Sequence, residues 1–416
     1  MITRFNQAKF KPRMFGAFLC MEEMVARILC VWEMGSSLGH LTNLKLFIDE
    51  ALQQGHKVSL AVRELQNVTT VFDLGNIQLL QAPFIKHPRR KYKTPMISIS
   101  QLILRQVFTN PQELAGLYHS WNSLFDLVRP DVVIYDHAPS ALVASFGKPW
   151  QKWVIGSGFL VPRSDGPFLG VFPGTPKSRE NDGILEQSER QLLALINQVL
   201  AESGRAEMTS VKDIYQQCDQ QLLLTLPELD HFGRRPKGNY LGLKWNVSTN
   251  PAHWLPRDAR YKAFAYLSFF PALPKLLNEL IARDVNLLLY SRNLPPELVR
   301  DYSDRVAFTD QPVDLKQVLG EVDFVINHGN HASAAQAYTM GCPQLLLPNH
   351  QEQLFLSRRV EQQGGGVVAI KQQEDLSEVL DRLMQLAHGG LPKPSESIDQ
   401  VVLFDSIHNL MMSLTE

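Results

Sequence analysis

The chain has 416 residues, of which 44% are hydrophobic, and its formal net charge is −1. This length exceeds what a single hydrophobic core usually supports, so we expect a soluble protein of two domains. The near-zero charge argues against a dedicated nucleic-acid binder, because no strong basic field is available to attract phosphates. The four cysteines form no CxxC or Cys/His metal pattern, and a reducing, cytoplasmic location is expected.

The N-terminal segment contains basic residues before a short apolar run, which faintly resembles a signal peptide. The run is too short, has no convincing cleavage site and is followed at once by acidic residues. We therefore expect residues 1–23 to be a disordered extension, or a misassigned start with Met24 as the true beginning. No stretch approaches the length of a transmembrane helix.

From residue 24 to about 235, apolar runs alternate with amphipathic segments. Continuous apolar runs predict parallel strands that are buried on both faces, and helical spacing predicts the helices that cover them. Residues 162–183 are rich in Pro, Gly and Ser and are expected to form a mobile loop. The predicted strands are 26–34, 56–63, 77–83, 130–136, 150–156 and 220–229, and the predicted helices are 41–54, 99–107, 113–128 and 184–203.

Residues 236–260 contain many helix and strand breakers and are predicted to link two domains. The same alternation then starts again, which predicts a second α/β unit of similar size. Its predicted strands are 262–269, 285–291, 323–328, 343–348 and 365–370, and its predicted helices are 271–283, 313–322, 332–340, 353–363, 376–387 and 401–414.

The predicted fold class is therefore α/β, with two facing Rossmann-like α/β/α domains. The N-terminal domain would span 24–235 and the C-terminal domain 261–395. Residues 396–416 would form a closing helix, and packing against the N-terminal domain is one option for it. Facing α/β domains place a cleft between the carboxyl ends of their strands, where such folds bind ligands.

One loop in the C-terminal half places polar residues directly after a predicted strand. His328, Gly329, Asn330 and His331 occupy this turn, and the next helix begins with small residues. Free N–H groups and the positive end of the helix dipole favour a phosphate there. Ser333 adds a hydroxyl donor, and a histidine can donate to a phosphate oxygen. From spacing alone, a plain βα turn with solvated histidines remains an equal alternative.

The longer stretch HGNHASAAQAYTMGCPQLLLPNHQEQ resembles the donor-binding motif of the family 1 glycosyltransferases, the UDP-glycosyltransferase superfamily. That motif runs His-Gly-Gly-x-Gly-Thr, then an acidic residue and Ala-Leu, Gly-x-Pro, a strand, and Pro before an acidic residue and Gln. This family has the GT-B fold of two facing Rossmann-like domains. The positions that match are His328, Gly329, Gly341, Pro343, Pro348, Glu352 and Gln353, and those that depart are Asn330, Ala332, Ser333 and Gln336.

The resemblance implies a nucleotide-sugar donor, most often a UDP-sugar. It implies that His328 and Ser333 hold the diphosphate together with neighbouring N–H groups, and that Glu352 and Gln353 hold sugar hydroxyls. Gln336 stands where an acidic residue usually binds the ribose, and an amide makes that contact without charge assistance. The implied donor-binding set is His328, Gly329, Asn330, Ser333, Gln336, Glu352 and Gln353.

A second departure from the family pattern lies at the end of the predicted strand 262–269. Family members often have Gly-Ser or Gly-Thr near the diphosphate there, where this chain has Phe269, Phe270 and Pro271. One expected phosphate contact is therefore missing.

His40 and Asp136 are the candidate catalytic pair in the N-terminal half. His40 follows the first predicted strand, and Asp136 ends a later one, so both should reach the same edge of the sheet. A carboxylate bonded to one imidazole nitrogen fixes the tautomer and leaves the other nitrogen basic. The alternatives are a packing role for His40 and a helix N-cap role for Asp136.

The stretch SLGHLTNLKLFIDEALQQGHKVSLAV resembles the first βαβ unit of the same family, whose loop histidine is the catalytic base, and Asp136 matches the aspartate that orients it. The resemblance implies an inverting transferase, of hexosyltransferase type, that acts on a hydroxyl of a small-molecule or lipid acceptor. No DxD-like cluster is present, so no metal and no cofactor besides the donor substrate are expected. A dehydrogenase is remote, because the loop of His40 lacks GxGxxG.

Two other functions remain open: a nucleotide-sugar epimerase or hydrolase of the same fold, and a non-catalytic nucleotide-sugar-binding protein. His137 is an alternative base, and His331 is an alternative phosphate ligand. The loops 84–110 and 160–185 are expected to form the acceptor site, and the basic stretch 87–95 would meet an anionic acceptor or a membrane surface, or be solvated. The aromatic residues that would line this site or the core are Trp121, Trp150, Trp153 and Phe159.

Overall fold

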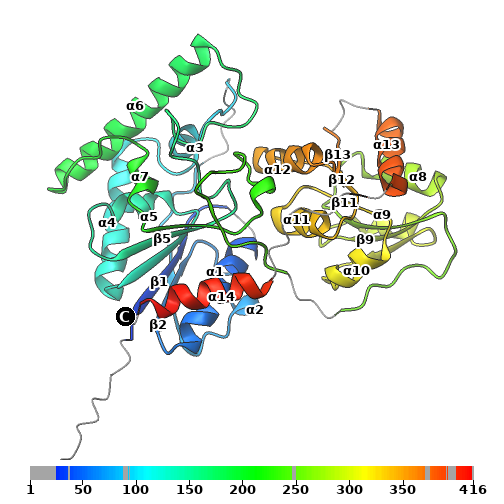
Figure 1. Cartoon of the computed structure of the whole chain (residues 1–416), viewed down its shortest axis with the longest axis horizontal. Helices are drawn as coiled ribbons and strands as arrows, with labels where there is room; N and C mark the ends of the chain where they lie inside the picture. The colour runs from blue at the N-terminus through cyan, green and yellow to red at the C-terminus, as the bar shows by residue number, and fades with distance from the viewer. Residues whose placement is uncertain are drawn as a thin grey trace, which may run out of the picture.

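The computed structural model describes residues 25–35, 38–87, 92, 94–245, 250–370, 375–389, 391 and 400–414. The extension predicted at 1–23 lies outside these residues. The described chain forms two α/β domains, each built on a parallel sheet with helices packed against it (Figure 1). The predicted fold class is confirmed.

The N-terminal sheet has seven strands in the order β3-β2-β1-β4-β5-β6-β7, and every neighbouring pair is parallel. The order reverses between β1 and β4, where open α/β sheets bind their ligands. All five residues of β4 are buried, as its continuous apolar run predicts. The strands are β1 (Arg27–Trp32), β2 (Lys57–Val62), β3 (Ile77–Gln81), β4 (Val132–Asp136), β5 (Gln151–Gly156), β6 (Gln220–Leu223) and β7 (Asn239–Tyr240).

The helices of this domain include one that starts earlier than the sequence predicts. The Ser178 hydroxyl oxygen accepts a hydrogen bond from the Asn181 N–H, and this cap starts the helix at Arg179 rather than at residue 184. The helices are α1 (Leu38–Gln53), α2 (Val68–Val71), α3 (Ile99–Gln106), α4 (Pro111–Val128), α5 (Pro139–Ala144), α6 (Arg179–Glu202), α7 (Asp213–Gln216) and the 3₁₀ turn η1 (Pro227–Leu229).

The C-terminal sheet has six parallel strands in the order β10-β9-β8-β11-β12-β13. Its order reverses between β8 and β11. The strands are β8 (Tyr261–Tyr266), β9 (Val285–Tyr290), β10 (Val306–Thr309), β11 (Phe324–Asn327), β12 (Gln344–Leu346) and β13 (Gly366–Val368), and the helices are α8 (Leu273–Ala282), α9 (Pro296–Tyr302), α10 (Leu315–Glu321), α11 (His331–Thr339), α12 (Gln351–Gln362) and α13 (Leu376–Gly389).

The last helix, α14 (Gln400–Met412), lies beside α1 of the N-terminal domain (Figure 1). Its Leu403, Ile407 and Met411 are buried in the same apolar cluster as residues of α1. His408 adds a polar contact, because its Nδ1 lies 2.7 Å from the Glu50 carboxylate. The chain therefore crosses from the C-terminal domain back to the first.

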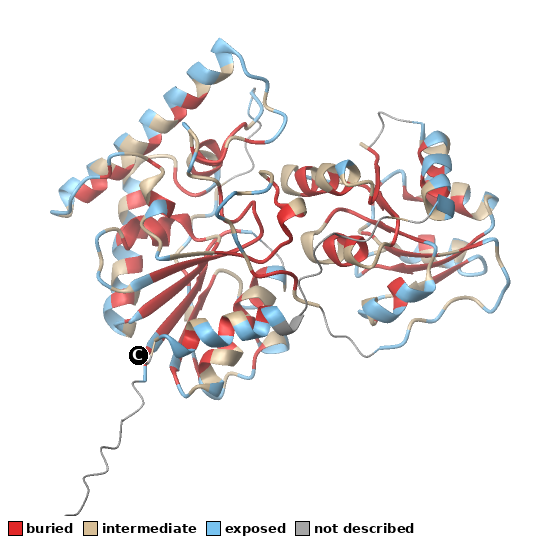
Figure 2. Cartoon of the chain, viewed as in Figure 1, coloured by how far each residue is buried: buried red, intermediate tan, exposed pale blue. Residues whose placement is uncertain are grey.

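Buried residues follow the strands and the inward faces of the helices in both domains (Figure 2). In the segment expected to be a mobile loop, Leu169 and Phe172 are buried and anchor it to the N-terminal core. Of the helices that the structure describes, none combines the length and the apolar character needed to cross a membrane.

Candidate active site

His40 and Asp136 meet at the point where the order of the N-terminal strands reverses. The two residues come from neighbouring strands, because Trp32 at the end of β1 pairs with Asp136 at the end of β4. The Nδ1 atom of His40 lies 2.8 Å from Oδ1 of Asp136, and both side chains are buried. The carboxylate accepts the Nδ1 proton, so Nε2 carries the lone pair of the neutral imidazole.

The imidazole of His40 is held between two other rings. Trp32 stacks on one side with ring centroids 5.1 Å apart, and His137 stacks at 6.0 Å. His137 adopts a φ of +47°, and its backbone oxygen accepts the Met34 N–H. His137, which the sequence offers as an alternative base, places its ring against that of His40. Burial holds the pKa of His137 at about 3, so it stays neutral.

Gly35 provides the space for the basic nitrogen. It has a φ of +87°, and a Cβ atom at this position would collide with Nε2 of His40. Among the described residues, none donates or accepts a hydrogen bond at Nε2, so this nitrogen remains available to a ligand. Glycine is therefore required here both by its backbone conformation and by its lack of a side chain.

Opposing effects set the pKa of His40. Burial lowers its pKa, but the charge of Asp136 and its hydrogen bond raise it, with a smaller contribution from Glu352. The net pKa is raised above the ordinary value. Glu352, in the first turn of α12, feels the same charges, and burial raises the pKa of its carboxyl. The residue predicted to hold sugar hydroxyls is thus close enough to the base to interact with it across the domains.

The C-terminal domain has a matching pair at its own reversal of strand order. His328 follows β11, and Ser268 follows the neighbouring β8. The Ser268 N–H donates to Nε2 of His328 at 3.0 Å, and the Ser268 hydroxyl lies at 3.0 Å from the same nitrogen. The Nδ1–H of His328 donates to the Leu347 oxygen at 2.8 Å. His328 is at the predicted place, but both ring nitrogens are bonded within the protein.

The loop before α11 is tied tightly to α12. Gly329 has a φ of +78°, and a Cβ atom there would collide with the Ser357 hydroxyl and the Gln353 backbone. Gln353 donates through Nε2 to the Asn330 side-chain oxygen at 2.7 Å and accepts the Asn349 N–H at 2.8 Å. Both polar atoms of Gln353 therefore shape the loop.

The N-terminus of α11 is where the sequence predicts an anion site. Asn330 is the N-cap residue, but its side chain makes no capping hydrogen bond. The first N–H groups of a helix have no partner within the helix, so those that follow Asn330 can receive an anion. The Ser333 hydroxyl lies in this first turn and donates to the Asn330 backbone oxygen at 3.2 Å.

Gln336, the predicted ribose ligand, is fully buried on α11. Its Nε2 donates to the Lys244 backbone oxygen at 2.8 Å, whereas its Oε1 has no hydrogen-bond partner among the described residues. The Lys244 ammonium in turn donates to the Thr42 oxygen in α1 at 3.1 Å. Lys244 thus connects the helix of Gln336 to the helix of His40.

The remaining candidates lie in other surroundings. The Nε2 atom of His331 lies 2.8 Å from the Thr225 hydroxyl, and burial lowers the pKa of His331 to about 4. Trp121 and Trp153 are buried in the core. Phe159 instead reaches the interface between the domains, where its ring lies 6.4 Å from Phe355 of α12. Only part of the basic stretch 87–95 falls within the described residues.

Sequence reasoning missed Ser268, Lys244 and Phe355 as parts of this site. The signal for Ser268 was present, because it ends a predicted strand whose edge should bind ligand. No local pattern marks Lys244 or Phe355.

Among the described residues, no three His, Cys, Asp or Glu side chains are grouped so as to hold a metal ion.

Comparison with known proteins shows similarity in structure only. No protein-family model matches the chain, and no curated protein matches its sequence significantly. Solved structures match over almost the whole chain. The glycosyltransferase of kitacinnamycin is 17% identical with a TM-score of 0.63 and covers 94% of this chain and 96% of its own.

Two further structures agree. A calicheamicin glycosyltransferase is 14% identical with a TM-score of 0.63, covering 94% of this chain and 95% of its own. The spinosyn rhamnosyltransferase SpnG in complex with thymidine diphosphate is 17% identical with a TM-score of 0.58, covering 94% of this chain and all of its own (100%). The chain therefore has the GT-B fold of the family 1 glycosyltransferases, as the resemblance in its sequence predicted.

Proposed function

We propose that the chain is an inverting glycosyltransferase that moves a sugar from a nucleoside-diphosphate donor to a hydroxyl of a small-molecule or lipid acceptor. The observation that carries this proposal is the buried pair of His40 and Asp136, whose atoms lie 2.8 Å apart at the reversal of strand order. A histidine oriented in this way is suited to general-base catalysis.

In this reaction, Nε2 of His40 accepts the proton of the acceptor hydroxyl as that oxygen attacks the anomeric carbon of the sugar. The bond from that carbon to the diphosphate breaks on the opposite face, which inverts the anomeric configuration. Asp136 stabilises the imidazolium that forms. A positioned general base accelerates such a step about 10²–10⁴-fold.

The donor would bind along the N-terminal ends of α11 and α12. The N–H groups after Asn330 and the Ser333 hydroxyl favour the diphosphate, whose departing charge they meet without a metal ion. His328 joins them if its Nε2, which now accepts the Ser268 N–H, takes up a proton and donates it to a diphosphate oxygen. Glu352, close to His40, is the candidate for the sugar hydroxyls.

The nucleotide we propose is UDP, which the donor motif of the sequence favours. Because SpnG was solved in complex with thymidine diphosphate, a TDP-sugar is the second donor to test. Gln336 would face the ribose through Oε1, the atom that has no hydrogen-bond partner among the described residues.

The test is to incubate the full chain with UDP-glucose or TDP-glucose and a panel of phenolic and lipid acceptors. We expect a new glycoside whose anomeric configuration, read by NMR, is opposite to that of the donor. Retention of configuration would contradict the His40 mechanism. Sugar released equally well without acceptor would indicate a hydrolase, and nucleotide binding without any turnover would indicate a binding protein.

A further inference from the structure

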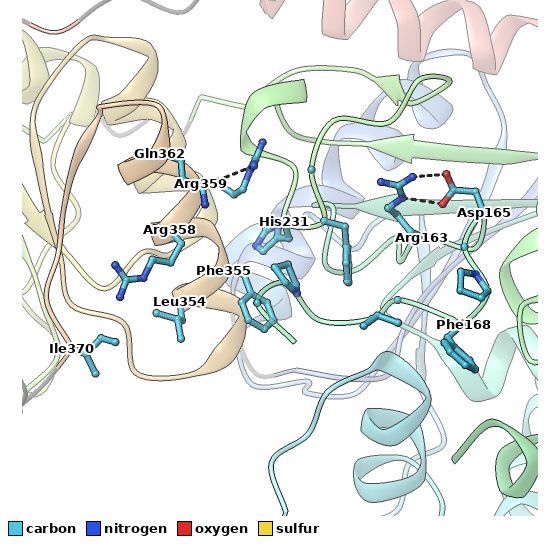
Figure 3. A pocket seen from close by; sticks show the side chains of 18 residues that line it. Arg163, Asp165, Phe168, His231, Leu354, Phe355, Arg358, Arg359, Gln362 and Ile370 are labelled. Carbon is cyan, nitrogen blue, oxygen red and sulfur yellow. Dashed lines mark hydrogen bonds and ion pairs between the residues drawn. The ribbon is translucent and has the colours of Figure 1, made fainter. Parts of the chain in front are cut away.

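A cavity of about 650 Å³ lies between α12 and the segment that follows β5 (Figure 3). Leu354 and Phe355 of α12 line one side, and residues 163–174 line the other. His231, from the segment after η1, lies next to Phe355 in the same view. Cavities of this size usually enclose molecules of drug-like dimensions.

Phe355 and Phe232 line the cavity, and further aromatic rings pack against them. Phe355 lies 5.2 Å from Phe172 and 6.4 Å from Phe159, measured between ring centroids. Phe159 is parallel to Phe232 at 6.5 Å, with an interplanar angle of 9°. Such rings favour a flat apolar ligand, which gains contact area and stacking on them.

The charged side chains of the cavity are mostly basic. Arg163, Arg358, Arg359 and Asp165 line it, so three cations and one anion leave a formal charge of +2. Asp165 is engaged by Arg163 through two hydrogen bonds of 2.8 and 2.6 Å. Arg358 is paired with Glu361, which does not line the cavity.

Arg359 is the arginine of the cavity whose charge is least neutralised by other side chains. It donates to the Glu228 backbone oxygen at 3.1 Å and to the Gln362 amide oxygen at 3.0 Å, both of which are uncharged. Within the described part of the chain no carboxylate pairs with it. A guanidinium in this state favours an anionic partner, because charge-assisted hydrogen bonds are about twice as strong as neutral ones.

His231 is an independent sign of a ligand. It is 1% exposed and lines the cavity, yet neither ring nitrogen has a hydrogen-bond partner in the described residues. Burial and the charges of His331, Arg235 and Arg359 lower its pKa, so it is a neutral ring in a positive potential. An unpaired buried polar group destabilises the folded protein, and a ligand that bonds to it would recover that free energy.

The cavity lies next to the site of His40. Phe355 lies three residues after Glu352, so the two side chains emerge on the same side of α12, about one turn apart. On the N-terminal side, His137 stacks on His40, and Phe159 packs edge-on against His137 at 6.4 Å. Both sets of contacts lead from the base to Phe355, which lines the cavity and against which Phe159 packs.

We propose that this cavity binds the acceptor and that the acceptor is a flat apolar molecule with an anionic group, such as a carboxylate or sulfonate. Its apolar body lies on Phe355 and Phe232, and its anionic group lies at Arg359 beside His231. This inference rests on the proposed function and adds the chemical class of the acceptor to it.

The test compares two fluorescent probes that differ in charge. Anilinonaphthalene sulfonate is flat, apolar and anionic, and N-phenylnaphthylamine is its neutral counterpart. We expect the full chain to bind the sulfonate about tenfold more tightly. Arg359→Gln should remove that preference and leave the affinity for the neutral probe unchanged, whereas Arg359→Lys should keep most of it. Equal affinity for both probes, or a preference that survives Arg359→Gln, would overturn the inference.

A matched control and a kinetic arm complete the design. Arg300→Gln removes an exposed arginine of α9, outside the cavity lining, and should change neither affinity. In transfer assays, hydroxynaphthoate should be preferred to naphthol, and the sulfonate probe should compete with it. Transfer to naphthol that the sulfonate does not inhibit would overturn the acceptor assignment while leaving the proposed function intact. Absence of turnover with every acceptor would instead contradict the proposed function.

Discussion

His40 and Asp136 are separated by 96 residues in sequence, yet their Nδ1 and Oδ1 atoms lie 2.8 Å apart. The parallel pairing of β1 with β4 brings them together, since it aligns Trp32 with Asp136 at the carboxyl edge of the sheet. The pair is then completed by Asn43, whose amide lies 3.4 Å from the second oxygen of Asp136. The N-terminal domain thus supplies both the proposed base and the carboxylate that orients it.

Asp136→Asn should lower the rate of transfer and shift its pH dependence. The neutral form of His40 is the base, so activity is lost as the pH falls through the raised pKa of His40. Asparagine removes a negative charge that raises this pKa, so the acid limb should move to lower pH. The plateau rate should fall about 10²-fold or more, because the imidazolium loses its counter-charge. An acid limb at the same pH in both proteins, measured as kcat/KM for the acceptor, would contradict this role.

Gly35→Ala should inactivate the enzyme by displacing a side chain. An alanine Cβ would collide with Nε2 of His40, and the φ of +87° adds backbone strain. Gly55→Ala is the matched control, because Gly55 follows the same helix with a φ of +79° and has open space around it. Both variants should lose about 1–2 kcal/mol of stability in thermal unfolding because of the left-handed backbone, and Gly35→Ala should lose more because of the collision. Only Gly35→Ala should lose transfer activity, and equal activities of the two would rule out this positioning role.

Gln336→Glu restores the acidic residue of the family motif, but we expect it to destabilise the protein. The side chain is fully buried, and its Nε2 donates to the Lys244 oxygen, so a carboxylate would face a carbonyl oxygen without compensation. The free energy of unfolding should fall by about 3 kcal/mol at neutral pH. The loss should shrink in acid, where a protonated carboxyl can donate. Wild-type stability combined with tighter nucleotide binding in calorimetry would show that the carboxylate finds the ribose instead.

Glu33 predicts a separate pH effect on stability. It accepts hydrogen bonds from the Ser140 N–H, the Ser140 hydroxyl and the Ala141 N–H, but its burial raises the pKa of the carboxyl to about 7. The pKa of Glu33 is higher in the folded than in the unfolded protein, so Glu33 contributes to the free energy of unfolding. This contribution is fully present below the unfolded pKa. It is lost as the pH rises through the folded pKa.

Glu33→Gln should abolish that loss. The difference in stability between wild type and variant should change by about 3 kcal/mol between roughly pH 4.5 and pH 7, at about 1.36 kcal/mol per pKa unit. Urea unfolding at several pH values measures it. A difference that stays constant across this window would show that the three hydrogen bonds keep the carboxyl ionised.

The fold was largely predictable from the sequence because each buried strand is a continuous apolar run, as in VVIYD of β4. The meeting of His40 with Asp136 was predictable for the same reason, since parallel strands end at one edge. Short elements such as β7 and β10 were not predicted. The two residues of β7 take their place only from pairing with β6, which no local pattern reveals.

The partners of the donor-site residues were not predictable. Ser268 bonds to His328 across 60 residues, and Gln336 bonds to the Lys244 backbone across 92. A motif identifies which side chains stand at a site, but the backbone groups that they contact depend on how distant segments pack. His231 shows the same limit, because its missing hydrogen bonds are visible only once the helix of Arg359 is placed beside it.

The most direct test of the central claim is transfer by His40→Ala, measured alongside nucleotide binding. His40 makes no hydrogen bond to any of the predicted donor-binding residues. Calorimetry should therefore give the same dissociation constant for the nucleoside diphosphate in both proteins. The rate of glycoside formation should fall about 10²–10⁴-fold, the contribution of a general base. A His40→Ala variant that binds the nucleotide and transfers sugar at the wild-type rate would contradict the account.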